Sequence, residues 1–252
     1  MIELRGLCAA YDGAEILHGI DARFPRGKIS VLCGPNGCGK STTVKALLRL
    51  VPEARGEILV DGTPLERFSQ KELARRIAYV PQSRNVPDIT VSRLVMHGRF
   101  PYLSYPRRYR KEDHARVREA LRQMGLEELA QRKLDSLSGG QRQKAYMAMA
   151  LAQDTDVIVL DEPTNFLDIR NQYELLANVR TLSGMGKTVI MILHDFELIL
   201  HCADHVVLLG DGRVRAAGSA RAVLESDALR ETFGVTPCFY ETPDGVHCYV
   251  KP

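Results

Sequence analysis

The alternation of apolar and polar positions predicts a succession of strands and helices. Short apolar runs stand at 2–7, 16–24, 29–33, 157–160, 188–193 and 206–209. The first two are β-type runs separated by the turn pair Asp12-Gly13, and they predict a small β layer. The others are almost wholly apolar, and amphipathic helical stretches lie between several of them. This pattern favours buried strands of a parallel sheet in an α/β fold.

The middle and the end of the chain follow different patterns. From 91 to about 134 the strand pattern gives way to helical patterning, which we interpret as a helical insertion. A short helical stretch at 220–233 precedes two β-type runs, 238–240 and 246–250. These runs predict a closing hairpin that turns at Pro243-Asp244-Gly245.

At 252 residues the chain could form one large domain or two modest ones, and its 45% apolar composition suffices for a buried core. We expect a single domain over 1–252. Within it, 91–134 would be a helical subdomain. The segments 1–90 and 135–252 would form the core, together with the β layer and a C-terminal extension.

Composition and charge limit the classes of partner and the cellular compartment to be expected for the protein. Charged residues make up 26% of the chain, and their positive and negative charges nearly balance, leaving a formal net charge of +3. The overall charge therefore does not require a polyanionic partner. No apolar run approaches the roughly 20 residues that cross a bilayer, and the N-terminus lacks the pattern of a secretory leader. Six cysteines occur without a CxxC pair, which is typical of reduced thiols. We therefore expect a soluble chain that stays in the cytoplasm.

A glycine-rich run between the strand at 29–33 and the helix from about 40 predicts a phosphate-binding loop. Its candidate residues are Gly34, Pro35, Asn36, Gly37, Cys38, Gly39, Lys40, Ser41 and Thr42. Such a loop directs backbone N–H groups at phosphates, while Lys40 neutralises the β- and γ-phosphates and Ser41 ligates Mg²⁺. A chance glycine turn before Lys-Ser is the plain alternative, and kinases and GTPases share the loop. We also expect the loop to lower the pKa of the Cys38 thiol and make it reactive.

Two acids follow the apolar run at 157–160 directly. At the carboxyl end of a buried strand, Asp161 would hold Mg²⁺, and Glu162 would polarise an attacking water as general base. Without the phosphate loop, an equally good interpretation is that these acids cap the turn at Pro163-Thr164.

A third motif identifies a family. The run Leu137-Ser138-Gly139-Gly140-Gln141-Arg142-Gln143 lies between the helical insertion and the strand before Asp161, and it resembles the signature of the ABC ATPases. Ser138 would cap a helix running to about Gln153, and the backbone N–H groups of the residues that follow Ser138 would form an anion site. A simple helix cap is the alternative.

The resemblance implies the ABC ATPase fold, in which a P-loop core with a parallel sheet carries an N-terminal antiparallel β layer and an inserted helical subdomain. It also implies a homodimer with ATP and Mg²⁺ between the phosphate loop of one copy and Ser138, Gly139, Gly140 and Gln141 of the other. Four further positions match the family: Tyr11 would stack on adenine, Gln82 would reach Mg²⁺ and water, His194 would contact the γ-phosphate, and Asp168 would position the opposing site. Without the resemblance, a core tyrosine and a structural histidine are the plain alternatives.

Within this family the stretches 74–82, 98–102 and 229–234 resemble importer subunits for iron-siderophore, haem and vitamin B12 complexes, with the ferric citrate type nearest. This implies a peripheral ATPase at the cytoplasmic face of the inner (plasma) membrane. There it would be docked on separate polytopic permease subunits and served indirectly by a periplasmic or extracellular binding protein. No nucleic acid is expected.

The alternatives are an ABC protein acting on nucleic acid or ribosomes and a small-molecule kinase. The basic, tyrosine-rich segment 101–111 fits a docking surface, a solvated loop or a nucleic-acid patch. The run His201-Cys202-Ala203-Asp204-His205 is not expected to bind a metal, because it straddles a helix end and a strand start.

Overall fold

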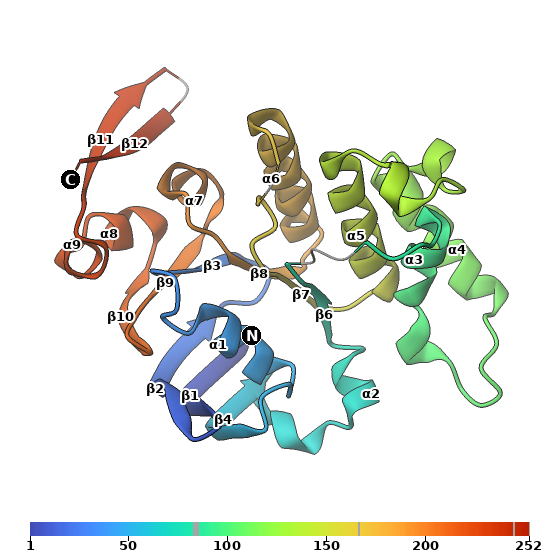
Figure 1. Cartoon of the computed structure of the whole chain (residues 1–252), viewed down its shortest axis with the longest axis horizontal. Coiled ribbons are helices and arrows are strands. Elements are labelled where there is room, and N and C mark those ends of the chain that lie inside the picture. The colour runs from blue at the N-terminus through green and yellow to red at the C-terminus, as the bar shows by residue number, and fades with distance from the viewer. Residues whose placement is uncertain (83–85, 166, 244, 252) are drawn as a thin grey trace. The chain divides into compact units, whose positions relative to one another are not determined.

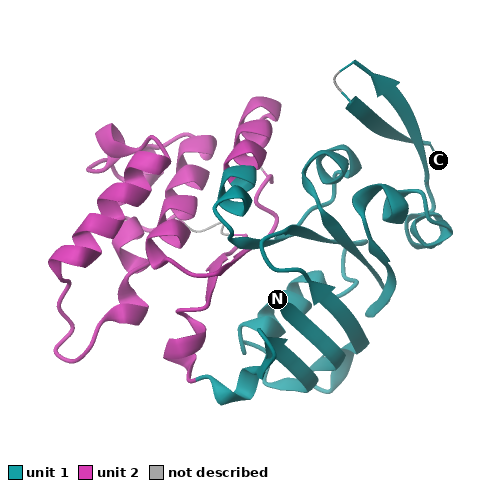
Figure 2. Ribbon diagram, turned by 180° about the vertical axis from the view of Figure 1, so that it is seen from behind, with its two compact units in different colours: residues 1–68, 179–252 teal, residues 69–178 magenta. Residues whose placement is uncertain are grey.

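The computed structural model describes residues 1–82, 86–165, 167–243 and 245–251. Asp244 of the predicted turn therefore lies outside the described residues. The chain divides into two compact units (Figure 2). Unit 1 comprises Met1–Phe68 and Val179–Pro252, and unit 2 comprises Ser69–Asn178. Among the described residues, no helix has both the length and the apolar character needed to cross a membrane.

Unit 1 begins with an antiparallel sheet in the strand order β2-β1-β4-β5. Its strands are β1 (Ile2–Tyr11), β2 (Ala14–Phe24), β4 (Glu53–Val60) and β5 (Thr63–Pro64) (Figure 1). Asp12 and Gly13 both have positive φ, which is the requirement of a tight hairpin turn between β1 and β2. The predicted β layer is confirmed, although the sequence pattern did not reveal β4 and β5.

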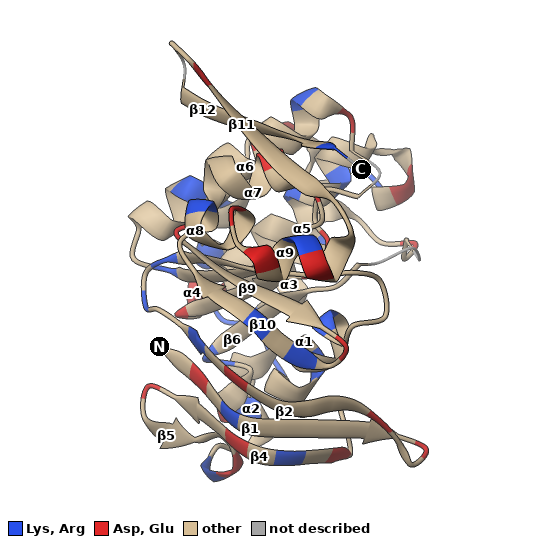
Figure 3. Cartoon of the chain, turned by 90° about the vertical axis from the view of Figure 1, so that its left-hand side faces the viewer, with Lys and Arg blue, Asp and Glu red and all other residues tan. Residues whose placement is uncertain are grey.

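Residues of both charge signs lie along the strands of this sheet (Figure 3). Arg5 donates hydrogen bonds to Glu57 on the neighbouring strand at 3.0 Å and to Glu3 at 2.9 Å. The Arg5–Glu57 pair is about half exposed, so its contribution to stability is small.

A second set of strands in unit 1 has the order β10-β9-β3-β8. Its members are β3 (Ile29–Cys33), β8 (Thr188–Ile192), β9 (His205–Gly210) and β10 (Arg213–Gly218). Strands β8 and β9 run parallel to β3, while β10 runs antiparallel to β9. Every residue of β3 and β8 is buried, which is why these strands read as continuous apolar runs.

The helices and the tail of unit 1 complete its architecture. Its helices are α1 (Lys40–Leu47), the 3-10 turn η1 (Leu65–Arg67), α7 (Phe196–Cys202), α8 (Ala220–Leu224) and α9 (Asp227–Phe233). The chain then forms the antiparallel hairpin of β11 (Thr236–Thr242) and β12 (Gly245–Lys251), in which β12 packs against α7. The predicted closing hairpin is thereby confirmed.

Unit 2 contains two parallel strands and most of the helices. The strands are β6 (Ile77–Val80) and β7 (Val157–Leu160), and the α-helices are α2 (Gln70–Leu73), α3 (Val91–His97), α4 (Lys111–Gln123), α5 (Gly139–Gln153) and α6 (Ile169–Gly184), whose last turns belong to unit 1. Short 3-10 turns are η2 (Phe100–Tyr102), η3 (Glu127–Leu129) and η4 (Leu134–Ser136). Helices α3, α4 and α5 pack on one another. The helical patterning predicted for 91–134 is confirmed, while the subdomain boundary stays a prediction.

Candidate nucleotide-binding and catalytic residues

The predicted phosphate loop joins β3 to α1 in unit 1. Gly34 follows β3 with a φ of 152°, and a Cβ there would lie 2.2 Å from the carbonyl oxygen of Leu209 on β9. Gly39, at the start of α1, has a φ of 103°. A side chain at Gly34 would thus collide with backbone that cannot move aside, so close packing against β9 requires glycine at this position.

Lys40 is buried and turns back on its own loop. Its ammonium donates hydrogen bonds to the carbonyl oxygens of Gly34 at 2.8 Å and Pro35 at 2.7 Å. These contacts fix the positive charge beside the loop backbone. Ser41 and Thr42 follow on the first turn of α1, both half-buried. A cation and hydroxyl groups are therefore presented by the same loop and helix start, which is the donor set that a phosphate with its Mg²⁺ requires.

His194 shares the sheet edge with this loop. Strand β8 pairs in parallel with β3, with Ile192 opposite Leu32, and His194 is the second residue after β8 ends. It is half-buried. Because both segments leave the carboxyl ends of adjacent parallel strands, the structure brings His194 and the loop to one edge of the sheet. Tyr11, by contrast, ends β1 in the antiparallel sheet and is half-buried there.

The two predicted carboxylates lie in unit 2, directly after β7, and Gln82 follows the neighbouring parallel strand β6. Glu162 has a φ of 47°, and its Oε2 accepts a hydrogen bond from Gln82 Nε2 at 2.6 Å. Asn165 Nδ2 donates to the same oxygen. The structure therefore brings Gln82 and Glu162 together, while the expected contact of Gln82 with Mg²⁺ and water stays a prediction. The contact of Asn165 with Glu162 was not foreseen from the sequence.

Asp161, next to Glu162, is buried and has a partner that the sequence did not indicate. The hydroxyl of Tyr79 on β6 donates to Asp161 Oδ2 at 3.0 Å. Burial, together with the charge of Asp161, raises the pKa of Tyr79, so the hydroxyl keeps its proton and remains a donor. The contact orients the carboxylate that is the candidate Mg²⁺ ligand. The sequence offers only the alternation of residues along β6 as a sign of where Tyr79 lies. Alternation within one strand cannot show a contact with a neighbouring strand.

The signature residues form a helix start in unit 2. Ser138 Oγ accepts from the N–H of Gln141 at 3.3 Å, and Gln141 Oε1 accepts from the N–H of Ser138 at 3.1 Å. This capping box begins α5, which ends at Gln153, so the predicted cap and helix length are confirmed. Ser138 and Gly139 are exposed. The anion-binding role of the N–H groups at this helix start stays a prediction.

Two further candidate residues, Gly140 and Asp168, have structural roles. Gly140 is buried, and a Cβ there would lie 2.2 Å from Asn171 Oδ1 on α6, so a side chain at this position would displace the Asn171 amide. Asp168 is exposed and caps α6, because its Oδ1 accepts from the backbone N–H and the Nδ2 of Asn171, both at 2.8 Å. Its proposed role toward an opposing site remains untested.

The expectation for Cys38 is wrong. The side chain is buried, and burial raises the pKa of the thiol by more than the positive charge of Lys40 lowers it. The sequence argument considered only the anion-attracting loop and not the loss of hydration, which disfavours a thiolate. Cys38 is therefore a poor nucleophile at neutral pH.

Comparisons with known proteins agree with these motifs. The family described as ABC transporter matches residues 17–165. The achromobactin transport ATP-binding protein CbrD of Dickeya dadantii is 41% identical over 249 residues, covering 96% of this chain and 93% of that protein. The ferric enterobactin transport ATP-binding protein FepC of Escherichia coli is 37% identical, covering 95% and 90%. A solved chain described as a metal-chelate type ABC transporter superposes with a TM-score of 0.86 at 27% identity, covering 100% and 96%.

Proposed function

The chain belongs to the ABC transporter family as an ATP-hydrolysing subunit, and on this premise we propose that it drives the uptake of an iron-siderophore complex. The observation that carries the proposal is the agreement among relatives that match over most of their length. Those from Dickeya dadantii, Bacillus anthracis and Escherichia coli are named for achromobactin, petrobactin and ferric enterobactin transport. A zinc transport ATP-binding protein of Treponema pallidum is 36% identical, which makes a bare metal cargo the second candidate.

ATP hydrolysis would use the residues that the motifs identify. Lys40 neutralises the β- and γ-phosphates, and Ser41 and Asp161 hold Mg²⁺. Glu162 polarises the attacking water as general base, and Gln82 and Asn165 fix its carboxylate through the hydrogen bonds to Oε2. His194 would contact the γ-phosphate, and Tyr11 would stack on adenine.

The signature helix would complete the site of a second copy. Ser138 and Gly139 are exposed at the N-terminus of the 15-residue helix α5, where the backbone N–H groups and the helix dipole favour an anion. The bacterial ABC transporter cassette MJ0796, 26% identical with a TM-score of 0.75 and covering 88% of this chain and 99% of that one, has been solved as a dimer. We propose that this chain likewise forms a homodimer that binds ATP between its copies.

Transport would require partners beyond the chain itself. As no described helix can span a membrane, the passage for the cargo would belong to separate permease subunits, on which the homodimer docks at the cytoplasmic face of the inner membrane. A substrate-binding protein on the far side would deliver the chelate. ATP-driven closure and hydrolysis-driven opening of the dimer would then switch the permease between its two states.

The test is reconstitution with the cognate permease in vesicles, with ATP hydrolysis and uptake of radiolabelled iron-siderophore measured together. Lys40→Ala removes at least one hydrogen bond between charged groups, worth about 1.5–3 kcal/mol, so ATP should bind roughly 10- to 150-fold more weakly or worse. Lys45→Ala, at an exposed position on the same helix, is the matched control and should retain both activities. Uptake of free zinc without uptake of iron chelate would replace the proposed cargo while leaving the ATPase assignment intact.

A further inference from the structure

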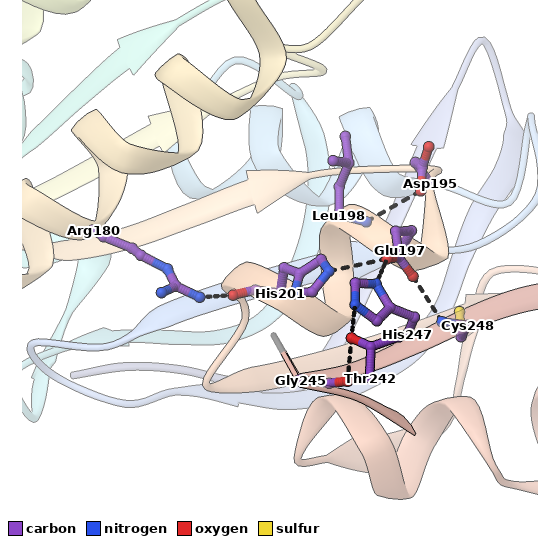
Figure 4. Close-up of polar contacts among 9 residues, drawn as sticks. All are labelled: Arg180, Asp195, Glu197, Leu198, His201, Thr242, Gly245, His247 and Cys248. Carbon is purple, nitrogen blue, oxygen red and sulfur yellow. Dashed lines mark hydrogen bonds and ion pairs between the residues drawn. The ribbon is translucent and has the colours of Figure 1, made fainter. Parts of the chain in front are cut away.

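Three side chains with metal-ligating groups converge between α7 and the C-terminal hairpin of unit 1 (Figure 4). Glu197 and His201 lie one turn apart on α7, and His247 lies on β12. Glu197 Oε1 is 2.9 Å from His201 Nε2 and 2.5 Å from His247 Nδ1. One ligand atom from each residue lies within 4.8 Å of the other two.

The hydrogen bonds around His247 hold its ring on both sides. Its Nε2 lies 2.9 Å from the Thr242 hydroxyl, whose oxygen also lies 3.2 Å from the carbonyl oxygen of Gly245. On the opposite side, Nδ1 lies 2.5 Å from Glu197 Oε1, and this oxygen also faces His201 Nε2. A metal ion bound by these three atoms would stand about 2.0–2.2 Å from each of them, so the side chains would move slightly apart to admit it.

The surrounding contacts hold the three ligands in place. The backbone N–H of Cys248 donates to Glu197 Oε2 at 2.7 Å, so the other oxygen, Oε1, is directed at the two imidazoles. The ring of Tyr240 stacks on that of His247 with centroids 5.3 Å apart. The His201 and His247 rings meet edge to face, with an interplanar angle of 75°. Hydrogen-bonded partners of this kind orient metal ligands and fix the tautomer of a ligating histidine.

We propose that Glu197 Oε1, His201 Nε2 and His247 Nδ1 bind a divalent transition-metal ion. Two imidazole nitrogens and one carboxylate oxygen suit ions such as Zn²⁺ or Fe²⁺ and disfavour Mg²⁺ and Ca²⁺, which prefer oxygen ligands. The three side chains are 25%, 27% and 22% exposed, in the order Glu197, His201, His247, so an ion can reach them from solvent. The ion would take the place of the protons that the two ring nitrogens direct at Glu197, and water would fill its remaining position.

Binding would join the hairpin to the helix. Strands β11 and β12 pair only with each other among the described strands, and an isolated two-stranded hairpin is marginally stable. Two of the proposed ligands come from α7 and one from β12, so the ion would link the two elements. Helix α7 begins two residues after His194, which places the link next to a candidate catalytic residue.

From the sequence, the run 201–205 was considered as a metal site and was not expected to bind a metal. Of the run 201–205, only His201 belongs to the cluster, and His205 lies on β9. The Glu197 and His201 spacing is common on helices, and His247 is too distant along the chain to be linked to it by spacing alone.

The test is titration of the tag-free, nucleotide-free protein with Zn²⁺ in excess Mg²⁺, followed by calorimetry, with Co²⁺ as the spectroscopic probe. One equivalent of Zn²⁺ should bind, and Co²⁺ should give d–d absorption without a thiolate charge-transfer band. His247→Ala and Glu197→Gln should weaken binding by about 100-fold or more, and Thr242→Val, which keeps all three ligands, by roughly 10- to 100-fold. His18→Ala is the matched control, since His18 contacts a single carboxylate, that of Glu15, at 3.0 Å, and should change nothing.

Circular dichroism of each variant establishes that it is folded. Absence of zinc binding in the wild type, or binding that His247→Ala leaves unchanged, would overturn the proposal. So would a thiolate band, because it would place the ion on cysteines. Nitrogen NMR gives the competing explanation a readout of its own: a His247 Nδ1 that still carries its proton in the presence of Zn²⁺ would show that a proton, not a metal, lies between Nδ1 and Oε1. All these outcomes are independent of ATP hydrolysis and transport.

Discussion

Replacing Arg99 by Met should destabilise unit 2 strongly, because it breaks a buried ion pair. Arg99 Nε donates to Asp113 Oδ1 at 2.9 Å, and Arg99 Nη1 donates to the carbonyl oxygen of Ala152 at 2.8 Å. The two charged side chains are only 5% and 7% exposed. The variant would leave a carboxylate and a carbonyl buried without these donors.

The magnitude follows from the burial of the pair. Removing one partner of a buried pair costs about 3–5 kcal/mol, because the remaining charge stays desolvated. Asp113 keeps the hydrogen bond from the N–H of Arg110 at 2.8 Å, which favours the lower end of that range. Since whole domains are stable by about 5–15 kcal/mol, the loss would take a large share of the free energy of unfolding.

The loss should also depend on pH. Burial raises the pKa of the Asp113 carboxyl, but the hydrogen bonds from Arg110 and Arg99 outweigh it and hold the pKa below its usual range. A lowered folded pKa stabilises the native state above the unfolded pKa of about 3.9, and this contribution disappears as pH falls through the folded pKa. In Arg99→Met the Asp113 carboxyl stays buried and loses a hydrogen-bond donor, so its pKa rises. Protonation of this carboxyl at lower pH then removes the buried charge that destabilises the variant. The difference in unfolding free energy should therefore shrink as pH is lowered from neutral.

Urea denaturation followed by circular dichroism at several pH values measures both effects. Arg116→Met is the control, because its ion pair with Asp154 at 3.4 Å is about half exposed and should be worth less than about 1 kcal/mol. A loss in Arg99→Met as small as in the control, or one that is constant with pH, would refute the reasoning.

Three further predictions concern the candidate site. Gly34→Ala should lose binding of a fluorescent ATP analogue while the protein stays folded, because the added Cβ would push the phosphate loop away from the Leu209 carbonyl. Unchanged affinity would show that the close contact of the loop with β9 is not needed for binding. Cys38 should be alkylated more slowly than the half-buried Cys238, and its alkylation should speed up as pH rises toward the raised pKa of its thiol. Peptide mass spectrometry can follow both residues, and faster alkylation of Cys38 than of Cys238 would show that Cys38 is a reactive thiol after all. Asn165→Ala should slow ATP hydrolysis by about 10-fold or more with unchanged ATP affinity, because it removes a hydrogen-bond donor to the charged Glu162. A change in ATP affinity without a change in the hydrolysis rate would show that Asn165 serves binding instead.

The sequence predicted the elements whose signals are local. The apolar run of β3, the glycine loop and the start of α1 are contiguous, and the capping box of Ser138 and Gln141 spans four residues. Local spacing and backbone propensity decide such features. The same holds for β7, which delivers its two acids directly.

What the sequence could not predict depends on residues brought together by the fold. The hydrogen bond from Tyr79 to Asp161 joins strands about 80 positions apart, and His247 meets Glu197 from 50 positions away. The pKa of Cys38 depends on burial by neighbouring segments, which no local pattern reveals. Strands β4 and β5 were missed because polar residues dominate the first half of β4 and β5 has two residues.

The central claim is that Glu162 activates water at a site completed by the signature helix of a second copy. The most direct test is analytical sedimentation of Glu162→Gln with saturating Mg-ATP. The amide oxygen of glutamine can still accept from Gln82 and Asn165, so the loop should keep its shape, while losing the base should slow hydrolysis by about 10²- to 10⁴-fold. The account predicts a stable dimer with ATP retained, where the same variant without nucleotide is a monomer. A monomer in saturating Mg-ATP would contradict it.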